Sequence, residues 1–482
     1  MDKANADIIT DKSTQRWITI SIAFAAFMSK LDSSIVNISL PAISQYFNVG
    51  TSDVSWVMLS YLLIQTNTML ITGKLGDVIG LKKTFITGYV VFTVGSLLCG
   101  LSPGITMLII SRCLQGIGGA MIVTSAFAAV PKYLPDTIIG SAFGVAATAA
   151  ALGLIIGAPL GGFITGYLSW HWIFLINIPI GIIAIFIAQR VIPGKKAAAH
   201  DAGTRGKGFD ITGAGLSFFG LLALTYGLNR GQELGWGSPF VVGLFIASCV
   251  LLSAFYWWEK RSSNPLIDLG LFRNHNFTYA SVAGFTAFMV LSGVNFLTPF
   301  YFEFAKGLNS QQVGMVFLCF SAVYVVIGPV AGRISDKIEP SHLCAAAMIS
   351  GSLCMFTFAV TSQYQGLTFG LIFLVWFALS YGMFISPNNN QAMRLAPTDE
   401  QGIASGVFTT MTSLGLVCGV SVFETIFSQS LPDNVSVKVI AQTRPHIMLA
   451  GFRHAFIAAG ITTFAAFLFS LLIRENRKAY FS

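Results

Sequence analysis

An aspartate and a lysine interrupt the first long apolar run of the chain, which starts near Trp17 and ends near Pro41. Asp32 and Lys30 lie about midway along this run, which is long enough to cross a bilayer as a helix. A charged side chain at the centre of a bilayer costs about 2.5–3.5 kcal/mol on insertion scales, and a membrane protein that keeps one there usually uses it. Asp32 is therefore a candidate for proton transfer. The alternative is a buried ion pair that only holds helices together.

A second charge, Arg112, lies within a later apolar run, with Gln115, Gly116 and Gly119 on the same helical face. A guanidinium inside a membrane needs an internal partner, and the two glycines let another backbone approach closely. An isolated carboxyl group in an apolar interior favours its neutral form, whereas a nearby cation favours its charged form. Asp32 can therefore bind a proton when it is isolated and release it when Arg112 approaches, as proton coupling requires.

Further polar residues within apolar runs are candidates for binding a substrate. Tyr61 and Gln65 lie on one face of the second run, where they either line a wet cavity or form hydrogen bonds with a neighbouring helix. Glu424 lies toward the end of the apolar run 403–428 and is a candidate for a second proton site or for contact with a cation. We predict that five residues contact the substrate: Lys30, Tyr61, Gln65, Gln115 and Glu424.

Lys30 has two interpretations, which the sequence leaves open. It is two positions from Asp32 and therefore points to nearly the opposite face of the helix, so that a pair within the helix is unfavourable. Lys30 either pairs with an acid on another helix or binds an anionic or zwitterionic group of a substrate.

The apolar content of the chain places all of these residues in a membrane protein. Of the 482 residues, 54% are hydrophobic and 10% are charged, and the mean hydropathy is +0.72. No soluble core needs so much apolar surface, and runs of about 18 or more apolar residues indicate transmembrane helices. We predict an all-α integral membrane protein with fourteen such helices, near residues 17–40, 54–72, 84–101, 105–129, 139–168, 173–192, 211–228, 239–257, 277–300, 312–332, 341–361, 367–386, 403–428 and 451–473.

The net charge of +8 is explained by membrane topology and does not indicate nucleic-acid binding. If both termini are cytoplasmic, the cytoplasmic segments carry 21 Lys and Arg residues and the external segments carry five. This bias follows the positive-inside rule and predicts a multi-pass protein of the plasma (inner) membrane with both termini in the cytoplasm. The first run is too long for a cleavable signal peptide, and the seven cysteines lack the spacing of metal ligands, so we expect free thiols and no metal.

An internal repeat divides the chain into two similar halves. Eight residues recur after 262 positions without a gap, and both copies would cross the membrane in the same direction. The pattern predicts two six-helix bundles related by a pseudo-two-fold axis along the membrane normal. We expect an N-terminal bundle at 1–195, a basic linker with two inserted transmembrane helices at 196–262, and a C-terminal bundle at 263–482. The eight repeated residues are Pro135, Gly140, Ala142, Gly144, Val145, Leu152, Gly153 and Gly157.

The segment 73–83, between the second and third runs, is expected to form a short cytoplasmic turn. Its glycines permit a tight bend, and its lysines stay outside the membrane. A shorter copy occurs in the second half, where Asp336 follows Asp77 by 259 residues. This recurrence supports the division into two halves.

The sequence resembles the major facilitator superfamily over nearly its whole length, and in particular its fourteen-helix drug:proton antiporter branch. Val78 and Leu81 replace basic residues that are usual in the signature of the superfamily at this loop, and Pro159 comes one position later than in the antiporter motif. The resemblance rests on six stretches in the expected order: 31–41 (LDSSIVNISLP), 73–83, 112–116 (RCLQG), 153–162, 170–179 and 264–272.

This resemblance implies alternating access, in which two bundles rock about a central cavity, and proton-driven export of amphipathic compounds. It implies that Asp32 carries the proton and that Arg112 is its modulating partner. It further implies a conformational latch on the cytoplasmic side and a bend in helix five. The latch residues would be Gly73, Asp77, Gly80, Lys83 and Asp336, and the helix-five antiporter motif would comprise Gly153, Gly157, Pro159, Gly161 and Gly162.

We expect a transporter and not an enzyme. It would act as a monomer in the lipid bilayer, with protons and a small amphipathic molecule as partners, without nucleic acid and without a cofactor. The sequence has no phosphate-binding loop of the G-x-x-x-x-G-K-[ST] type, which disfavours ATP as the energy source. Three alternatives stay open: a proton-coupled symporter for an organic anion or zwitterion, an exporter of a lipid-like molecule, and a membrane sensor on the same fold. The lack of a sizeable soluble domain argues against the sensor.

Overall fold

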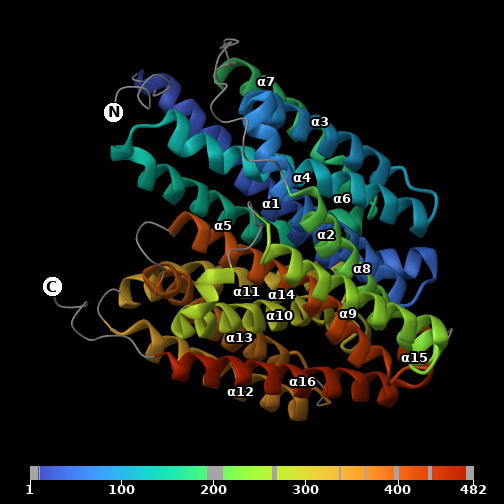
Figure 1. Cartoon of the computed structure of the whole chain (residues 1–482). Coiled ribbons are helices and arrows are strands. Elements are labelled where there is room, and N and C mark those ends of the chain that lie inside the picture. The colour runs from blue at the N-terminus through green and yellow to red at the C-terminus, as the bar shows by residue number, and fades with distance from the viewer. Residues whose placement is uncertain are drawn as a thin grey trace. The chain divides into compact units, whose positions relative to one another are not determined.

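Helices account for all of the regular structure in the described part of the protein (Figure 1). The all-α prediction is therefore confirmed. For several helical residues, including 73–78, only the backbone is described. The computed structural model describes residues 9, 11–192, 210–262, 269–335, 338–363, 366–395, 401–432 and 437–473.

The polypeptide forms two compact units, each of which has its own core. The first unit comprises Met1–Ser39 with Ser60–Phe218, and the second comprises Leu40–Leu59 with Phe219–Ser482. The end of α1 and the start of α2 thus belong to the second unit. The first eight helices are α1 Lys12–Phe47, α2 Thr51–Ile79, α3 Leu81–Gly100, α4 Ile105–Tyr133, α5 Asp136–Tyr167, α6 Trp172–Leu175, α7 Asn177–Val191 and α8 Ile211–Leu234.

The remaining helices all belong to the second unit. They include two short irregular helices, η1 and η2, on either side of α10. Their bounds are α9 Pro239–Glu259, η1 Leu269–Arg273, α10 His275–Phe300, η2 Tyr301–Ala305, α11 Ser310–Ser335, α12 Pro340–Thr361, α13 Thr368–Leu395, α14 Gln401–Ser428, α15 Val437–Thr443 and α16 Pro445–Leu472.

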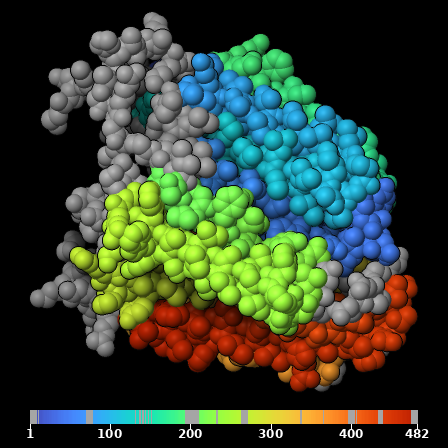
Figure 2. All heavy atoms as spheres, turned by 45° about the vertical axis from the view of Figure 1, so that its right-hand side comes forward, coloured from blue at the N-terminus to red at the C-terminus, as the bar shows by residue number. Residues whose placement is uncertain are grey.

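Twelve helical segments among the described residues are long and apolar enough to cross a membrane. The helices α2 and α8 are not among them, although they contain 29 and 24 residues. The count covers only residues whose side chains are described, and several residues of α2 and of α8 are not among them. Much of the apolar surface of α9 is exposed, as expected for a helix that faces lipid (light green in Figure 2).

The predicted repeat makes equivalent close contacts in the two units. In the first unit α5 lies against α1, and a Cβ added to Gly153 would overlap the backbone oxygen of Phe27. In the second unit α14 lies against α10, and a Cβ added to Gly415 would overlap the backbone oxygen of Phe285. Gly153 and Gly415 are separated by the 262 residues of the repeat. Each unit therefore uses a repeated glycine to bring two helix backbones together.

The connection between α2 and α3 differs from the turn expected at 73–83. The helix α2 continues through Ile79, and Gly80 alone separates it from α3, with a φ of 95° that favours glycine. The prediction is wrong here because it treats Gly73 and Gly76 as turn residues. Glycine inside a helix costs only about 1 kcal/mol relative to alanine, which the rest of a long helix tolerates.

The first helix begins before the apolar run because Asp11 caps it. The Asp11 carboxylate accepts hydrogen bonds from the Thr14 hydroxyl at 2.6 Å and from the Thr14 backbone N–H at 2.9 Å. These bonds hold the pKa of Asp11 below its usual range. They also satisfy an N–H group that the first helical turn leaves without a partner, so α1 extends beyond its apolar part.

Aromatic rings fill much of the core of the second unit. The rings of Phe358 and Phe373 stack with centroids 3.9 Å apart, and the ring of Tyr301 meets Phe358 edge-on at 5.0 Å. The Tyr301 hydroxyl donates to the backbone oxygen of Ser362 at 2.9 Å, so its polar end is also satisfied. Aromatic pairs of this kind contribute about 0.5–1.5 kcal/mol beyond their burial. They join η2, α12 and α13 within one core.

Candidate functional site

A buried ion pair joins α1 and α4 in the first unit. Arg112 Nη1 lies 3.0 Å from Asp32 Oδ2, and each of the two residues is 1% exposed. The two isolated charges that the sequence places in separate apolar runs are therefore in direct contact. Each supplies the internal partner that the other needs inside a membrane.

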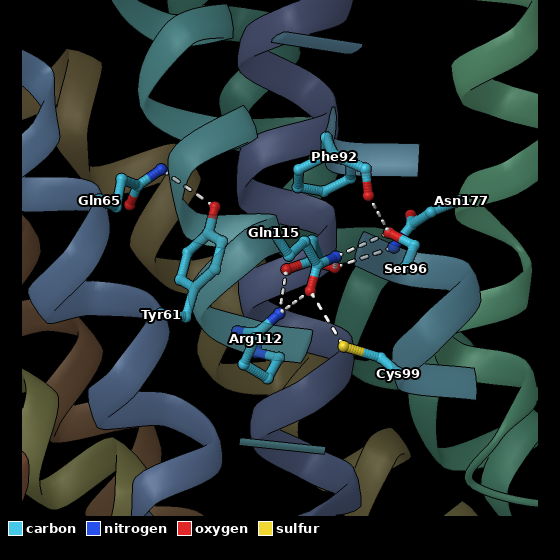
Figure 3. A network of polar contacts seen from close by, with 9 residues as sticks. Tyr61, Gln65, Phe92, Ser96, Cys99, Arg112, Gln115 and Asn177 are labelled. Carbon is cyan, nitrogen blue, oxygen red and sulfur yellow. Dashed lines mark hydrogen bonds and ion pairs between the residues drawn. The ribbon is translucent and has the colours of Figure 1, made fainter. Parts of the chain in front are cut away.

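Two amides complete the surroundings of the Asp32 carboxylate. Gln115 Nε2 and Asn177 Nδ2 donate to Asp32 Oδ1 at 3.0 Å and 2.9 Å, and both amide residues are fully buried. Figure 3 shows Arg112, Gln115 and Asn177 converging from α4 and α7. We call Asp32, Arg112, Gln115 and Asn177 the Asp32 network.

Arg112 also has neighbours that do not depend on Asp32. Its Nη1 donates to Gln115 Oε1 at 2.6 Å, and its guanidinium carbon lies 4.1 Å from the centroid of the Tyr61 ring. A cation above an aromatic face gains about 0.5–2 kcal/mol. Tyr61 in turn accepts a hydrogen bond from Gln65 Nε2 at 3.0 Å. Arg112 therefore has two contacts besides its pair with Asp32.

Helical spacing and small residues explain how the elements build the network. Arg112 and Gln115 are three positions apart on α4 and therefore share one face. Gly116 and Gly119 lie on the part of α4 that faces α2. A Cβ added to Gly116 would come within 2.9 Å of the Tyr61 backbone oxygen, and one added to Gly119 within 2.8 Å of the Tyr61 hydroxyl. These glycines bring α2 close enough to place the Tyr61 ring over Arg112.

Three residues that the sequence interpretation does not assign contact Asp32 or Gln115: Asn177, Ser96 and Cys99. Asn177 begins α7, immediately after the break at Ile176 that separates α6 from α7. Ser96 accepts a hydrogen bond from Gln115 Nε2 at 2.8 Å, and Cys99 Sγ lies 3.8 Å from Gln115 Oε1. The signal for Asn177 is an amide in an otherwise apolar run. A serine or cysteine in such a run carries no comparable signal.

The predicted substrate-contact residues lie in different surroundings. Tyr61 and Gln115 are buried against Arg112, and Gln65 is half-buried beside Tyr61. Lys30 is exposed, on a face of α1 away from Asp32, and no carboxylate in the described ranges forms an ion pair with it. Glu424 is fully buried in the second unit.

The glycine motif of α5 sets the distance between α5 and the helix that carries Asp32. Pro159 lies inside α5 and removes one N–H donor from its hydrogen-bond ladder, and Gly162 is buried. Three glycines of the motif lie so close to α1 that an added Cβ would meet its atoms: Gly153, Gly157 and Gly161.

The predicted latch residues are only partly described. Gly73 and Asp77 lie in the last turns of α2, with side chains outside the described part of the chain. Gly80 forms the break between α2 and α3, and Lys83 is exposed in the first turn of α3. Asp336 lies outside the described residues. The latch stays a prediction.

The sequence matches a known protein family and resembles characterised transporters. Residues 22–420 match the sequence model of the Major Facilitator Superfamily. The riboflavin transporter RibZ of Clostridioides difficile (strain 630) is 32% identical over 470 residues, which cover 96% of this chain and 99% of RibZ. The multidrug resistance protein Stp of Mycobacterium tuberculosis (strain CDC 1551 / Oshkosh) is 28% identical over 446 residues, which cover 89% of this chain and 81% of Stp.

Solved structures agree on the architecture. A bacterial homologue of the human lysosomal transporter Spinster, in an inward-facing and unoccupied conformation, aligns with a TM-score of 0.68. The alignment covers 96% of this chain and 97% of that chain at 13% sequence identity. A likeness at this level of identity bears on the fold alone.

Proposed function

The chain belongs to the Major Facilitator Superfamily, and we propose on this basis that it is a proton-coupled exporter of amphipathic small molecules that works by alternating access. The observation that carries the proposal is the buried pair of Asp32 and Arg112 with its amide donors. Ionisable groups inside membrane helices commonly mark ion pathways and proton relays. The name of Stp, a multidrug resistance protein, supports drugs as substrates, and the name of RibZ makes riboflavin a compound to test.

In this proposal Asp32 exchanges a proton for its contact with Arg112. A proton on Asp32 removes its negative charge and weakens its attraction to the guanidinium. Arg112 then relies on Gln115 and the Tyr61 ring, both of which already contact it. When Arg112 pairs with Asp32 again, the proton leaves to water. The network thus has two arrangements that differ by one proton, and substrate binding can favour either one.

The energy available to such a cycle is sufficient for export. A proton that moves down the membrane potential supplies about 2.3 kcal/mol per 100 mV, before any pH gradient is added. Because each 1.4 kcal/mol corresponds to about a tenfold ratio, one or two protons can drive appreciable accumulation of a substrate outside.

We further infer that α2 and α8 cross the membrane together with the twelve apolar segments, which gives fourteen spans. With 29 and 24 residues, both exceed the length of about 20 residues that a bilayer requires. Their polar side chains have partners within the protein: Asn67 donates to the Leu63 backbone oxygen, and Asn229 donates to Ser55. With fourteen spans and the observed charge bias, both termini lie in the cytoplasm and the protein resides in the plasma membrane.

The variant Asp32→Asn tests the proposal with purified protein in liposomes under an imposed pH gradient. Gradient-driven transport of ethidium and riboflavin is expected to fall to the level of protein-free liposomes, because an amide cannot carry the proton. Binding of the transported compound should remain measurable. The control Asp11→Asn keeps a helix-capping side chain outside the membrane and should transport as the wild type does. Normal gradient-driven transport by Asp32→Asn would remove Asp32 from the proton path.

A second candidate function is proton-coupled symport of an organic anion or zwitterion. The observation that favours it is the exposed Lys30, which has no ion pair with a carboxylate in the described chain. The same liposomes, tested with cationic, neutral and anionic compounds, distinguish the two functions. Movement of substrate against the direction of the protons indicates antiport, and movement with the protons indicates symport.

A further inference from the structure

Glu424 on α14 is a second fully buried carboxyl group, and it belongs to the second unit. Its Oε1 accepts hydrogen bonds from the hydroxyls of Thr51 and Ser52, at the start of α2, at 3.0 Å and 2.8 Å. Its Oε2 accepts a hydrogen bond from Asn229 Nδ2, on α8, at 3.2 Å. The Glu424 carboxyl group therefore accepts hydrogen bonds from uncharged side chains of two other helices, α2 and α8.

Asn229 connects this carboxyl group to a buried polar junction of three helices. Its Nδ2 also donates to Ser55 at 3.0 Å, and its Oδ1 accepts from Trp56 Nε1 at 2.8 Å. The hydroxyls of Ser421 and Thr425, on α14, donate to backbone oxygens of α8 at 3.3 Å and 3.0 Å. We call the following residues the Glu424 junction: Glu424, Asn229, Thr51, Ser52 and Ser55.

The charged groups near the junction have other partners or are exposed. Asp53 on α2 and Arg230 on α8 pair with each other at 2.9 Å, and both are partly exposed. Glu303, in η2, accepts a hydrogen bond from Gln45 at 2.7 Å. On α16, which contacts α14 through Gly451, Arg453 and His454 are exposed. Among the described residues, no cation forms an ion pair with Glu424.

The internal repeat provides no equivalent of this acid in the first half. The 262-residue offset pairs Glu424 with Gly162. Its partner Asn229 lies on α8, which belongs to the segment without a counterpart in the repeat. The Glu424 junction is therefore specific to the second half, and it gives α8 a defined role in holding the start of α2.

We propose that Glu424 is a second proton-binding group and that its protonation releases the start of α2 from α14 and α8. The inference depends on the proposed function only for its energy source, the proton gradient. Hydrogen bonds to an ionised carboxylate are roughly twice as strong as those between neutral groups. The donors Thr51 and Ser52 are therefore bound most strongly when Glu424 is ionised. A proton from water, added to a carboxylate oxygen, weakens these bonds and returns to water when they form again.

Infrared spectroscopy tests the proton-binding step on the purified full-length protein in liposomes, without any substrate. On titration from alkaline to acidic pH, the wild type is expected to gain the carbonyl-stretch band of a protonated buried carboxyl group. Glu424→Gln should lack this component of the change, whereas Asp32→Asn should retain it. A titration of Glu424→Gln that matches the wild type over the whole range would overturn the assignment. Because no transport is measured, this result is independent of the transport test of Asp32.

A distance measurement tests the release of α2. Spin labels at Asn48→Cys, in the turn before α2, and Gln429→Cys, just after α14, occupy two exposed positions of the second unit. The labelled protein carries serine in place of the four cysteines that are not fully buried: Cys113, Cys249, Cys319 and Cys418. Acidic pH is expected to lengthen the distance between the labels, and Glu424→Gln should show the longer distance at every pH.

Two further variants make the distance measurement specific to Glu424. Glu424→Asp keeps a carboxyl group and should restore the dependence on pH. His454→Gln removes the exposed imidazole of α16, which contacts Ser430, and should leave the dependence on pH unchanged. A distance that does not change with pH in the otherwise native protein, or a change that persists in Glu424→Gln, would overturn the proposal.

Discussion

The donors around Asp32 are of two kinds, and they contribute differently at the scale of single residues. Arg112 supplies a charge, whereas Gln115 and Asn177 supply neutral amide hydrogens that orient the carboxylate. A buried polar group that loses its partner costs about 1–3 kcal/mol. Loss of one amide should therefore disturb the network without separating the ion pair.

Asn177→Leu is expected to slow proton-driven transport without abolishing it. The leucine leaves Arg112 and Gln115 on the carboxylate, so the loss should amount to about 1–3 kcal/mol, or roughly five- to 150-fold in initial rate. The rate is measured in the liposomes described above. Asn177→Gln, which keeps an amide, should recover part of the activity. A wild-type rate for Asn177→Leu would show that this amide plays no part in coupling.

Lys30→Met is expected to change charge selectivity. The Lys30 ammonium and a cationic substrate about 6 Å away would repel each other by roughly 3 kcal/mol at an effective dielectric near 20. This repulsion corresponds to about a hundredfold in affinity for the cation. Loss of the ammonium should therefore improve transport of cations such as ethidium and impair transport of any anionic substrate. The control Lys12→Met removes an exposed charge at the start of the same helix. An unchanged cation-to-anion ratio with reduced protein yield would make Lys30 a structural residue.

Residue types in the sequence identify Asp32 and Arg112 as unusual, because charges are rare in apolar runs. The contacts that these residues make cannot be predicted from the residue types. Asn177 lies at the start of α7, after the break at Ile176. Pro179, in the first turn of α7, is a sequence signal for a helix start, but it does not indicate that the Asn177 side chain contacts Asp32. The lack of an ion pair for Lys30 likewise depends on which side chains neighbouring helices turn toward it.

At the scale of helices, glycines decide which backbones approach each other. The repeat predicts related halves from the sequence, and the same α5 to α1 and α14 to α10 contacts occur at Gly153 and Gly415. The end of α2 is less predictable, since Gly73 and Gly76 lie inside the helix and only Gly80 interrupts it. A glycine pattern indicates a close approach or a turn equally well, and only packing decides between them.

Gly153→Ala and Gly415→Ala should each destabilise the protein. An added Cβ would overlap a backbone oxygen at both positions, and overpacking of this kind costs about 1–3 kcal/mol. The control Gly243→Ala, on α9, adds a Cβ with no atom within 4 Å and should be neutral or stabilising. Thermal unfolding of the detergent-purified variants provides the measurement. Equal unfolding temperatures for all three variants would contradict the close approach of these helices.

Across the whole molecule, Asp32 and Glu424 lie in separate units and in contrasting surroundings. Asp32 pairs with Arg112 in the first unit, whereas Glu424 has neutral donors in the second. The first arrangement is predictable from two isolated charges. The second is not, because it depends on Asn229 of α8 and on the start of α2, which the sequence does not connect with Glu424.

Proton movement driven by a substrate gradient tests the central claim most directly. Liposomes contain a pH-sensitive dye and purified wild-type or Asp32→Asn protein, with no imposed proton gradient. A gradient of ethidium, or of the panel compound that the wild type transports fastest, is then applied. We predict that the wild type moves protons in the direction opposite to the substrate and that Asp32→Asn moves none. Equal proton movement by Asp32→Asn and the wild type would contradict proton coupling through Asp32.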